Sequence, residues 1–287
     1  MSERIQGTTR VYGIIGWPVA HSRSPLMQNA AFRAAGLDSV YVPFAVPPQS
    51  LCEAVRGLRS LGVAGWNVTI PHKTAIMPLL DKLSPEAVRS GAVNVVHNQD
   101  GCLVGYNTDG AGLLIALERT LDCQVAGLRI VVLGAGGAAR GAIAALLTAG
   151  AAQITVVNRT LAVAVQLVEA LGPLHPGSEL TAASFEQLDC LLPGADLLLN
   201  ATSVGLRGEE FIGLDLALLP DAAKVYDMVY GAVATPLVQS ATQRGLAACD
   251  GISMLIAQGE LAFACWTGIT PAPGLMAAQL AADIRVT

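Results

Sequence analysis

The sequence predicts an α/β fold built mainly from parallel strands. Three observations support this prediction: the chain has 287 residues, hydrophobic residues make up 53% of it, and short strand-like runs alternate with apolar, alanine-rich runs of helical length. The length is sufficient for two domains of the usual size, about 100 to 200 residues each. Charged residues make up only 14% of the chain, a composition typical of a compact protein with a sizeable core.

The first half of the chain predicts three strands separated by two helices. The first helix is expected to begin with Pro25 at its first position, to be capped by Ser24 and to end at Gly36. Strands are predicted over residues 11–15, 40–44 and 65–70, and helices over residues 25–35 and 49–61.

A second series of strands begins after Gly127. A connecting helix over residues 111–122 is predicted to join the two halves of the chain. The strands of the second half are predicted over residues 130–133, 154–157, 197–199 and 225–228.

Polar groups gather at the end of the predicted strand 65–70. Because alternate residues of a strand share a face, Asn67 and Thr69 are expected opposite Val68. Pro71 has no N–H group and ends the strand, which places Lys73 just past the carboxyl end, where open α/β sheets bind ligands. Lys73 is therefore a candidate acid or base, although an edge strand followed by a solvated turn lysine fits the same residues.

A phosphate-binding pattern follows the strand at residues 130–133. Gly134, Gly136 and Ala139 form the sequence G-x-G-x-x-A, directly before an alanine-rich helix. Gly134 permits the tight turn, Gly136 lets the backbone approach a pyrophosphate, and Ala139 permits close packing of the helix. The unpaired N–H groups and the positive end of that helix favour phosphate, so the segment predicts a dinucleotide site.

The end of the next strand indicates which dinucleotide binds. An NAD site has an acidic residue here for the ribose 2′-hydroxyl, whereas the 2′-phosphate of NADP requires a cation. This chain has Asn158, Arg159 and Thr160, which offer an amide, a guanidinium and a hydroxyl but no carboxylate. Because arginine can bind two phosphate oxygens at once, NADP is the predicted cofactor; a surface arginine in a turn is the alternative.

Charge and cysteine usage argue against several other classes of protein. The net charge is −5 without a basic block, which speaks against nucleic acid and anionic membrane surfaces, and no transmembrane segment is indicated. The six cysteines form no C-x-x-C pair, so we predict no metal site and reduced thiols in a cytoplasmic protein. Residues 1–5 are not followed by an apolar run, so no secretory signal is expected. The predicted partner is a small molecule, and the protein is expected to be a monomer or a homodimer.

Eight segments, taken in order along nearly the whole chain, resemble the shikimate dehydrogenase family. Their combined order is far more specific than any single motif. They cover residues 16–29, 67–73, 91–94, 107–110, 134–140, 158–160, 200–203 and 250–258.

The resemblance implies an N-terminal α/β substrate domain, a Rossmann-like NADP domain and a C-terminal helical segment that returns to the first domain. The implied substrate-binding catalytic domain covers residues 1–109 and 251–287, and the implied NADP-binding domain covers residues 110–250. The reaction implied is reversible hydride transfer between NADPH and the C3 carbonyl of 3-dehydroshikimate, which gives shikimate in aromatic amino acid biosynthesis.

The same resemblance implies roles for individual residues. Lys73 and Asp109 would form the catalytic proton-transfer pair, although Asp109 also suits a helix N-cap. Implied substrate contacts are Ser22, Ser24, Asn67, Thr69, Asn94, Tyr230 and Gln258, with both serines binding the carboxylate. Implied cofactor contacts are Gly134, Ala135, Gly136, Gly137, Ala138, Asn158, Arg159, Thr160, Thr202, Met228 and Gly251.

Three residues depart from the family pattern. Val163 stands four positions after Arg159, where a second basic residue is common, which weakens the expected preference for NADP. Gln28 stands where histidine is usual before Asn29, and Val95 stands where threonine is usual. These changes leave open a paralogue that acts on quinate or aminoshikimate with relaxed use of NAD and NADP.

Two functions of other kinds share part of this pattern. A non-catalytic NADP-binding sensor would keep the glycine-rich turn and Arg159 but would not need Lys73 together with Asp109. A methylene-folate dehydrogenase or a glutamyl-tRNA reductase-like enzyme would share the second domain but would lack segments 21–25 and 67–73 together. The presence of all these features favours the shikimate dehydrogenase interpretation.

Overall fold

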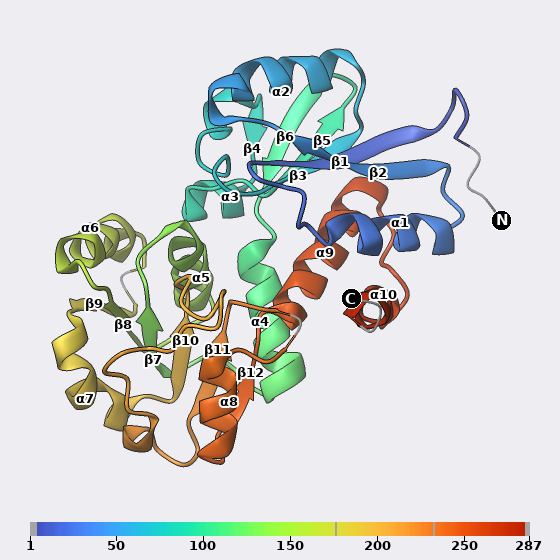
Figure 1. Ribbon diagram of the computed structural model, residues 1–287. Helices are drawn as coiled ribbons and strands as arrows, with labels where there is room; N and C mark the ends of the chain where they lie inside the picture. Colours follow the sequence, from blue (N-terminus) through green and yellow to red (C-terminus); the bar gives the residue numbers. More distant parts are fainter. Residues whose placement is uncertain (1–4, 176, 232, 285–287) are drawn as a thin grey trace. The chain divides into compact units, whose positions relative to one another are not determined.

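The computed structural model describes residues 5–175, 177–231 and 233–284, and its internal contacts divide the chain into two compact units (Figure 1). Unit 1 comprises Met1–Thr108 and Ile256–Thr287, and unit 2 comprises Asp109–Leu255. The second division falls inside helix α9 (Ile252–Thr267), which continues from one unit into the other. The domain limits implied by the resemblance fall after residues 109 and 250, and their assignment to substrate and cofactor stays a prediction.

The sequence predicts neither a secretory signal nor a transmembrane segment. Residues 1–4, which carry most of the segment searched for a secretory signal, lie outside the described residues. Among the residues that are described, no helix combines the length and the apolar character needed to cross a bilayer.

Unit 1 is built on a six-stranded mixed sheet with the strand order β2-β1-β3-β5-β6-β4. Strand β1 is parallel to both of its neighbours, whereas β5 is antiparallel to β3 and to β6. Asp100 and Gly101 connect β5 to β6, and both have positive φ, as two-residue hairpin turns require. The strands are β1 (Arg10–Gly16), β2 (Ser39–Ala45), β3 (Gly65–Val68), β4 (Lys82–Leu83), β5 (Val95–Gln99) and β6 (Cys102–Tyr106).

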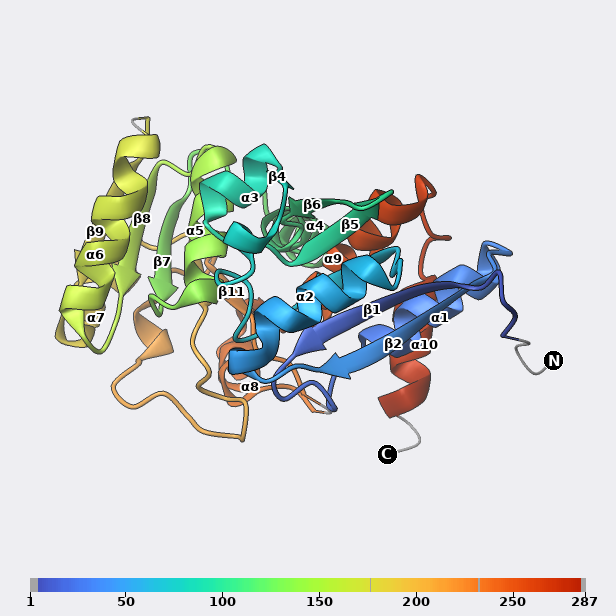
Figure 2. The same ribbon diagram turned by 90° about the horizontal axis from the view of Figure 1, so that it is seen from above.

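Helices cover both faces of this sheet. Val55 and Leu58 of α2 belong to one buried cluster with Trp66, and Figure 2 shows α2 lying over β1. On the other face, the ring of Tyr12 lies 4.8 Å from that of Phe32 in α1, which itself packs against α10. The helices of unit 1 are α1 (Ser24–Ala34), α2 (Leu51–Ser60), α3 (Pro85–Ser90) and α10 (Leu275–Ile284), with 3₁₀ turns at Pro48–Ser50 and Met77–Leu79.

Unit 2 has a six-stranded sheet in which every pairing is parallel, in the order β12-β11-β10-β7-β8-β9. The chain begins at the central strand β7, moves outward to one side and then outward to the other, which is the Rossmann arrangement. In Figure 1, β7 is green, its neighbour β10 is yellow, and β11 on the other side of β10 is orange. The strands are β7 (Arg129–Leu133), β8 (Gln153–Val157), β9 (Glu179–Ala183), β10 (Leu197–Asn200), β11 (Lys224–Asp227) and β12 (Ala247–Cys249).

The helices of unit 2 also form two layers. One buried cluster joins α4, α5 and α6 to alternate residues of the strands, such as Ile130 and Val132, and a second joins α7 and α8 to the residues between them, such as Val131. The helices are α4 (Asp109–Leu121), α5 (Gly137–Thr148), α6 (Leu161–Leu171), α7 (Leu188–Leu191) and α8 (Pro236–Gln243). Short 3₁₀ turns occur at Gly172–Leu174, Phe185–Gln187, Leu192–Gly194 and Leu216–Leu218.

The predicted α/β fold is confirmed, with differences at particular positions. Ser24 does not cap α1: the helix already includes Ser24, and no side chain makes a capping hydrogen bond. Gly36 ends the helix region as predicted, with a φ of +66° and Leu37 N donating to Phe32 O at 3.0 Å. Strand β3 ends at Val68, two residues earlier than predicted, and Ile70 is exposed.

Candidate functional site

A chain of hydrogen bonds joins several of the predicted substrate-binding residues of unit 1. Tyr41 Oη donates to Asn67 Oδ1 at 2.6 Å, and Asn67 Nδ2 donates to the Asn94 carbonyl oxygen at 3.1 Å. Asn94 Nδ2 donates to Thr108 Oγ1 at 3.0 Å, and Asn94 Oδ1 accepts from Thr108 N at 2.8 Å. Thr108 Oγ1 donates in turn to the Gln258 carbonyl oxygen at 3.2 Å. Five residues from separate parts of the sequence therefore meet in one polar network.

The network is buried, so its geometry is fixed. Asn67, Asn94 and Thr108 are 6%, 2% and 9% exposed. A buried amide or hydroxyl is costly unless it is hydrogen-bonded, and these bonds are therefore expected to persist in solution. The side-chain amides of Asn67 and Asn94 are therefore held in fixed orientations.

The two predicted carboxylate ligands lie at the start of α1. Ser22 Oγ accepts a hydrogen bond from Ser24 N at 3.3 Å, and Ser22 N donates to Val19 O at 3.0 Å. The Ser24 side chain is buried and hydrogen-bonded to Tyr41, which connects it to the polar network. Ser22 is connected to the network only indirectly, through the N–H group of Ser24.

Thr69 and Lys73 follow β3 in a turn. Thr69 N donates to Ile15 O at 2.9 Å, and His72 N donates to Thr69 O at 2.9 Å. The Lys73 carbonyl oxygen accepts from Val93 N at 2.8 Å, so this turn is tied to the segment that carries Asn94. The side chains of Thr69 and Lys73 are partly buried.

A buried histidine anchors the same turn. His72 is 1% exposed, and its Nε2 lies 2.7 Å from the Val46 carbonyl oxygen. This contact fixes the backbone directly before Lys73. His72 is thus a supporting residue, whereas the sequence alone did not assign it a role.

Asp109, the second predicted catalytic residue, is the first residue of α4 and belongs to unit 2. It directly follows Thr108 of the polar network and is partly buried.

The glycine-rich turn of unit 2 has the geometry that the sequence predicts. Gly134 has a φ of +103°, and its N–H donates to Val157 O at 2.8 Å. A Cβ atom on Gly134 would lie 2.9 Å from Thr202 Cγ2 and 3.1 Å from Ala201 O, so the turn requires glycine. A Cβ atom on Gly136 or Gly137 would meet open space, so nothing obstructs the approach of a ligand to this backbone.

The first turn of α5 is suited to phosphate. Gly136 is the N-cap residue and has no side chain to occupy the free N–H groups, while Gly137 and Ala138 are exposed and Ala135 is partly buried. Ala139 is fully buried against the core of unit 2, as expected for the residue that lets the helix pack closely.

The segment after β8 carries Arg159, the predicted cation for a 2′-phosphate, on the surface of unit 2. Asn158 Nδ2 donates to the Thr160 carbonyl oxygen at 2.9 Å, which fixes a turn directly before α6. Arg159 and Thr160 are exposed, and no acidic residue occurs in the first turn of α6. Val163 is 41% exposed in that turn, so the position where the family commonly has a second cation also faces solvent.

Met228, Tyr230 and Gly251 lie close together in unit 2. A Cβ atom on Gly251 would lie 2.8 Å from the carbonyl carbon of Met228 and 3.3 Å from Tyr230 Cδ1. Gly251 N also donates to Val229 O at 3.1 Å. A side chain at position 251 would collide with the backbone that follows β11, so close packing requires glycine here.

Asp227, a buried carboxylate of unit 2, is not among the site residues predicted from the sequence. Asp227 is fully buried and accepts hydrogen bonds from Asn200 Nδ2 at 2.7 Å, Val229 N at 2.9 Å and Thr235 Oγ1 at 2.6 Å. Burial raises the pKa of Asp227 above its ordinary value. Asn200 Oδ1 accepts from both the N–H and the hydroxyl of Thr202, so this cluster holds the ends of β10 and β11, where Thr202 and Met228 lie. A lone aspartate within an apolar strand was the available signal.

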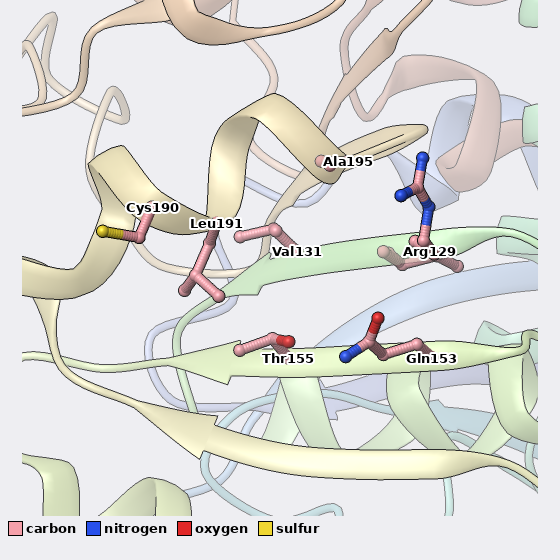
Figure 3. A pocket seen from close by; sticks show the side chains of 9 residues that line it. Arg129, Val131, Gln153, Thr155, Cys190, Leu191 and Ala195 are labelled. Atoms are coloured by element: carbon pink, nitrogen blue, oxygen red, sulfur yellow. The ribbon is translucent and has the colours of Figure 1, made fainter.

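A cavity of about 220 Å³ lies elsewhere on unit 2 (Figure 3). Figure 3 shows Leu191 reaching from α7 toward β7 and β8, whose early residues Arg129 and Gln153 also line the cavity. The glycine-rich turn and Arg159 follow the opposite, carboxyl ends of these strands. None of the predicted site residues lines this cavity, and no group of metal-ligating side chains occurs in the part of the chain that the structure describes.

Comparisons with known proteins agree with these features. The family described as "Shikimate dehydrogenase substrate binding domain" matches residues 14–96, "Shikimate / quinate 5-dehydrogenase" matches residues 116–207, and "Shikimate 5'-dehydrogenase C-terminal domain" matches residues 251–281. The chain is 52% identical over 283 residues to the shikimate dehydrogenase (NADP(+)) of Geobacter metallireducens, which covers 98% of this chain and 99% of that one.

Solved structures are similar over the same length. The shikimate 5-dehydrogenase of Listeria monocytogenes in complex with shikimate and NAD has a TM-score of 0.91 and 35% identity, covering 98% of this chain and 99% of that one. The quinate dehydrogenase of Corynebacterium glutamicum in complex with NAD has a TM-score of 0.88 and 30% identity, covering 96% of this chain and 99% of that one.

Proposed function

This chain belongs to the shikimate dehydrogenase family, and we propose that it catalyses the NADP-dependent, reversible reduction of 3-dehydroshikimate to shikimate. The observation that carries the proposal is the buried network that joins Asn67, Asn94 and Thr108, because it presents amides at the end of β3, next to the turn of Lys73. Unit 1 is then the substrate-binding catalytic domain, and unit 2, with its glycine-rich turn, is the NADP-binding domain.

The roles of single residues follow from this assignment. Bound NADPH supplies the hydride. Lys73 and Asp109 are the proposed catalytic pair, and the substrate is held by Ser22, Ser24, Asn67, Thr69, Asn94, Tyr230 and Gln258. The cofactor is held by the backbone of residues 134–138, by Asn158, Arg159 and Thr160, and by Thr202, Met228 and Gly251.

A paralogous activity on quinate or aminoshikimate is the alternative. Gln28 and Val95 depart from the family pattern, and the similarity extends to a quinate dehydrogenase. The difference between these substrates is one ring substituent, which a pocket can discriminate by anything from about tenfold to 10⁵-fold.

Initial rates of oxidation of shikimate, quinate and aminoshikimate, each with NADP and NAD, test the proposal. We expect shikimate with NADP to have the highest kcat/KM and 3-dehydroshikimate to be reduced with NADPH. Absence of any reduction by purified, folded protein would refute the function, and a higher kcat/KM for quinate would establish the alternative.

NADP is expected to be used at least about tenfold more efficiently than NAD, equivalent to ~1.4 kcal/mol of transition-state stabilisation. The reason is that the exposed Arg159 offers a cation to the 2′-phosphate, with no carboxylate at Asn158 to favour the 2′-hydroxyl. The ratio of kcat/KM values measures this preference, and Arg159→Ala is expected to bring it close to one. Val163→Arg is the matched gain-of-charge variant and should raise the ratio; equal use of both cofactors by the unaltered protein would identify Val163 as the weak position.

We propose that the enzyme is located in the cytoplasm. We also propose that it is a monomer or a homodimer. All six cysteines are free thiols, which supports a reducing compartment. Light scattering of the purified protein decides between the two oligomeric states.

A further inference from the structure

We propose that Tyr41 is a positioning residue for the substrate: its hydroxyl fixes the side-chain amide of Asn67 so that Asn67 presents an N–H group to an oxygen of the substrate ring. The inference rests on the proposed function, because it takes the ligand to be a ring with several hydroxyl groups.

The backbone of Tyr41 is fixed from α1. Asn29 Nδ2 donates to the Tyr41 carbonyl oxygen at 2.9 Å, and Asn29 Oδ1 accepts from Tyr41 N at 2.8 Å. Strand β2 is at the edge of the sheet, and this side-chain amide satisfies the backbone groups that an edge strand leaves unpaired. The Tyr41 ring is 1% exposed and lies 6.1 Å from the ring of Trp266 in α9. The hydroxyl therefore has one position.

The direction of each hydrogen bond follows from counting hydrogens. Asn67 Oδ1 has no hydrogen, so the single hydrogen of the Tyr41 hydroxyl must lie in the 2.6 Å bond to Asn67. Burial raises the pKa of Tyr41 well above its usual range, so this hydroxyl keeps its hydrogen at every assay pH. The bond between Ser24 and Tyr41 then uses the hydrogen of Ser24, which leaves Ser22 as the serine with a hydrogen for a carboxylate.

Counting hydrogens also assigns the partners of the Asn67 side-chain amide. Its Oδ1 accepts from Tyr41, and one Nδ2 hydrogen is donated to the Asn94 carbonyl oxygen at 3.1 Å. The second Nδ2 hydrogen is the group left for a ligand, and its natural partner is an acceptor oxygen. Rotating the amide by 180° would place Oδ1 against the Asn94 carbonyl oxygen, where two acceptors would face each other, and would leave the hydrogen of the Tyr41 hydroxyl without Oδ1 as its acceptor.

Tyr41→Phe removes one oxygen atom and keeps the ring. Without the hydroxyl, Asn67 Oδ1 loses its partner and only the bond to the Asn94 carbonyl oxygen still holds the amide, so kcat/KM for shikimate is expected to fall about tenfold, mainly through KM, while KM for NADP stays unchanged. Tyr12→Phe is the matched control, because Tyr12 is directly opposite Tyr41 in the sheet, is equally buried and lies outside the polar network. Its kinetic constants should equal those of the unaltered enzyme.

Substrate analogues separate positioning from a merely structural effect. Two analogues of shikimate, each without one of the two ring hydroxyls that are not oxidised, are compared on the unaltered enzyme and on Tyr41→Phe. We expect one analogue to lose much kcat/KM on the unaltered enzyme and little on Tyr41→Phe, because the variant has already lost the contact that the missing hydroxyl would make. Asn67→Asp, which replaces the donor by an acceptor, should weaken shikimate binding further than Tyr41→Phe does.

The outcomes distinguish this inference from the proposed function. If the unaltered enzyme oxidises shikimate and Tyr41→Phe behaves like Tyr12→Phe, or loses the same factor on both analogues, the role of Tyr41 is wrong. If the unaltered enzyme does not oxidise shikimate, the proposed function itself fails. Circular dichroism and the melting temperature of both phenylalanine variants establish that they are folded.

Discussion

Lys73→Ala is expected to lower kcat for the reduction of 3-dehydroshikimate by roughly 10²- to 10⁴-fold, the usual range for loss of a general acid or base. Negative charge develops on the substrate carbonyl oxygen as the hydride arrives, and in the proposed mechanism an ammonium group at Lys73 would stabilise this charge and then donate the proton. In the oxidative direction the same nitrogen must be neutral, because it receives the proton. The bond from Val93 N to the Lys73 carbonyl oxygen and the contact of the His72 ring with the Val46 carbonyl oxygen hold the turn in place without the lysine side chain, so the variant is expected to fold.

Three measurements decide whether Lys73 transfers the proton. The dissociation constant of NADPH, measured by direct titration, should be nearly unchanged in Lys73→Ala, because Lys73 belongs to unit 1 and the glycine-rich turn belongs to unit 2. Lys82→Ala removes an exposed lysine of the same unit and is the matched control, with an expected kcat equal to that of the unaltered enzyme. An increase of KM with kcat preserved would show that Lys73 only binds a substrate hydroxyl, and would leave proton transfer to Asp109 or water.

The central strands of unit 2 could be predicted because burial on both faces leaves a simple pattern. Residues 130–133 and 154–157 are almost continuous apolar runs, and they form β7 and β8 in the middle of the sheet. The two edge strands were missed. β9 is partly exposed, and β12 has three residues, so neither has the continuous apolar run on which the prediction depends.

The antiparallel part of unit 1 was missed for a different reason. β5 contains the polar residues His97 and Asn98, and β6 is a run of five residues that includes Gly105, so neither stands out as a continuous apolar run. The pair Asp100-Gly101 between them is a strong hairpin signal that the sequence did offer. A search for turn residues would have found this hairpin.

Hydrogen-bond partners within the candidate site were beyond the reach of the sequence. Ser24 has the residue type of a helix cap, but its side chain is hydrogen-bonded to Tyr41 instead. Tyr41 itself has the pattern of an ordinary core aromatic in a strand, and Thr108 that of a turn residue. Motif spacing can indicate which residues belong to a site, whereas the partner of a buried hydroxyl is set by the packing of β2, β3 and α9 around it.

Asp109→Asn is expected to lower kcat by about 10²-fold or more, because asparagine keeps the size of the side chain but has neither its charge nor its proton-accepting oxygen. Loss of the carboxylate also removes a contribution to the stability of α4, which is separate from any role in proton transfer. Asp109 is the first residue of α4, where a carboxylate stabilises the helix by about 0.3 to 1 kcal/mol, and the melting temperature measures this contribution separately. Asp122→Asn, which changes an exposed aspartate next to the other end of α4, is the control and should leave both kcat and the melting temperature nearly unchanged.

The double variant tests whether Lys73 and Asp109 act as one unit. If the two residues share a single proton-transfer step, loss of either abolishes that step, and the double variant should be little slower than the slower single variant. If they act independently, their factors multiply, and kcat should fall by the product of the two single losses. A multiplicative result would therefore separate the roles, with Lys73 acting on the carbonyl oxygen and Asp109 only orienting a hydroxyl, even if each single variant behaves as expected.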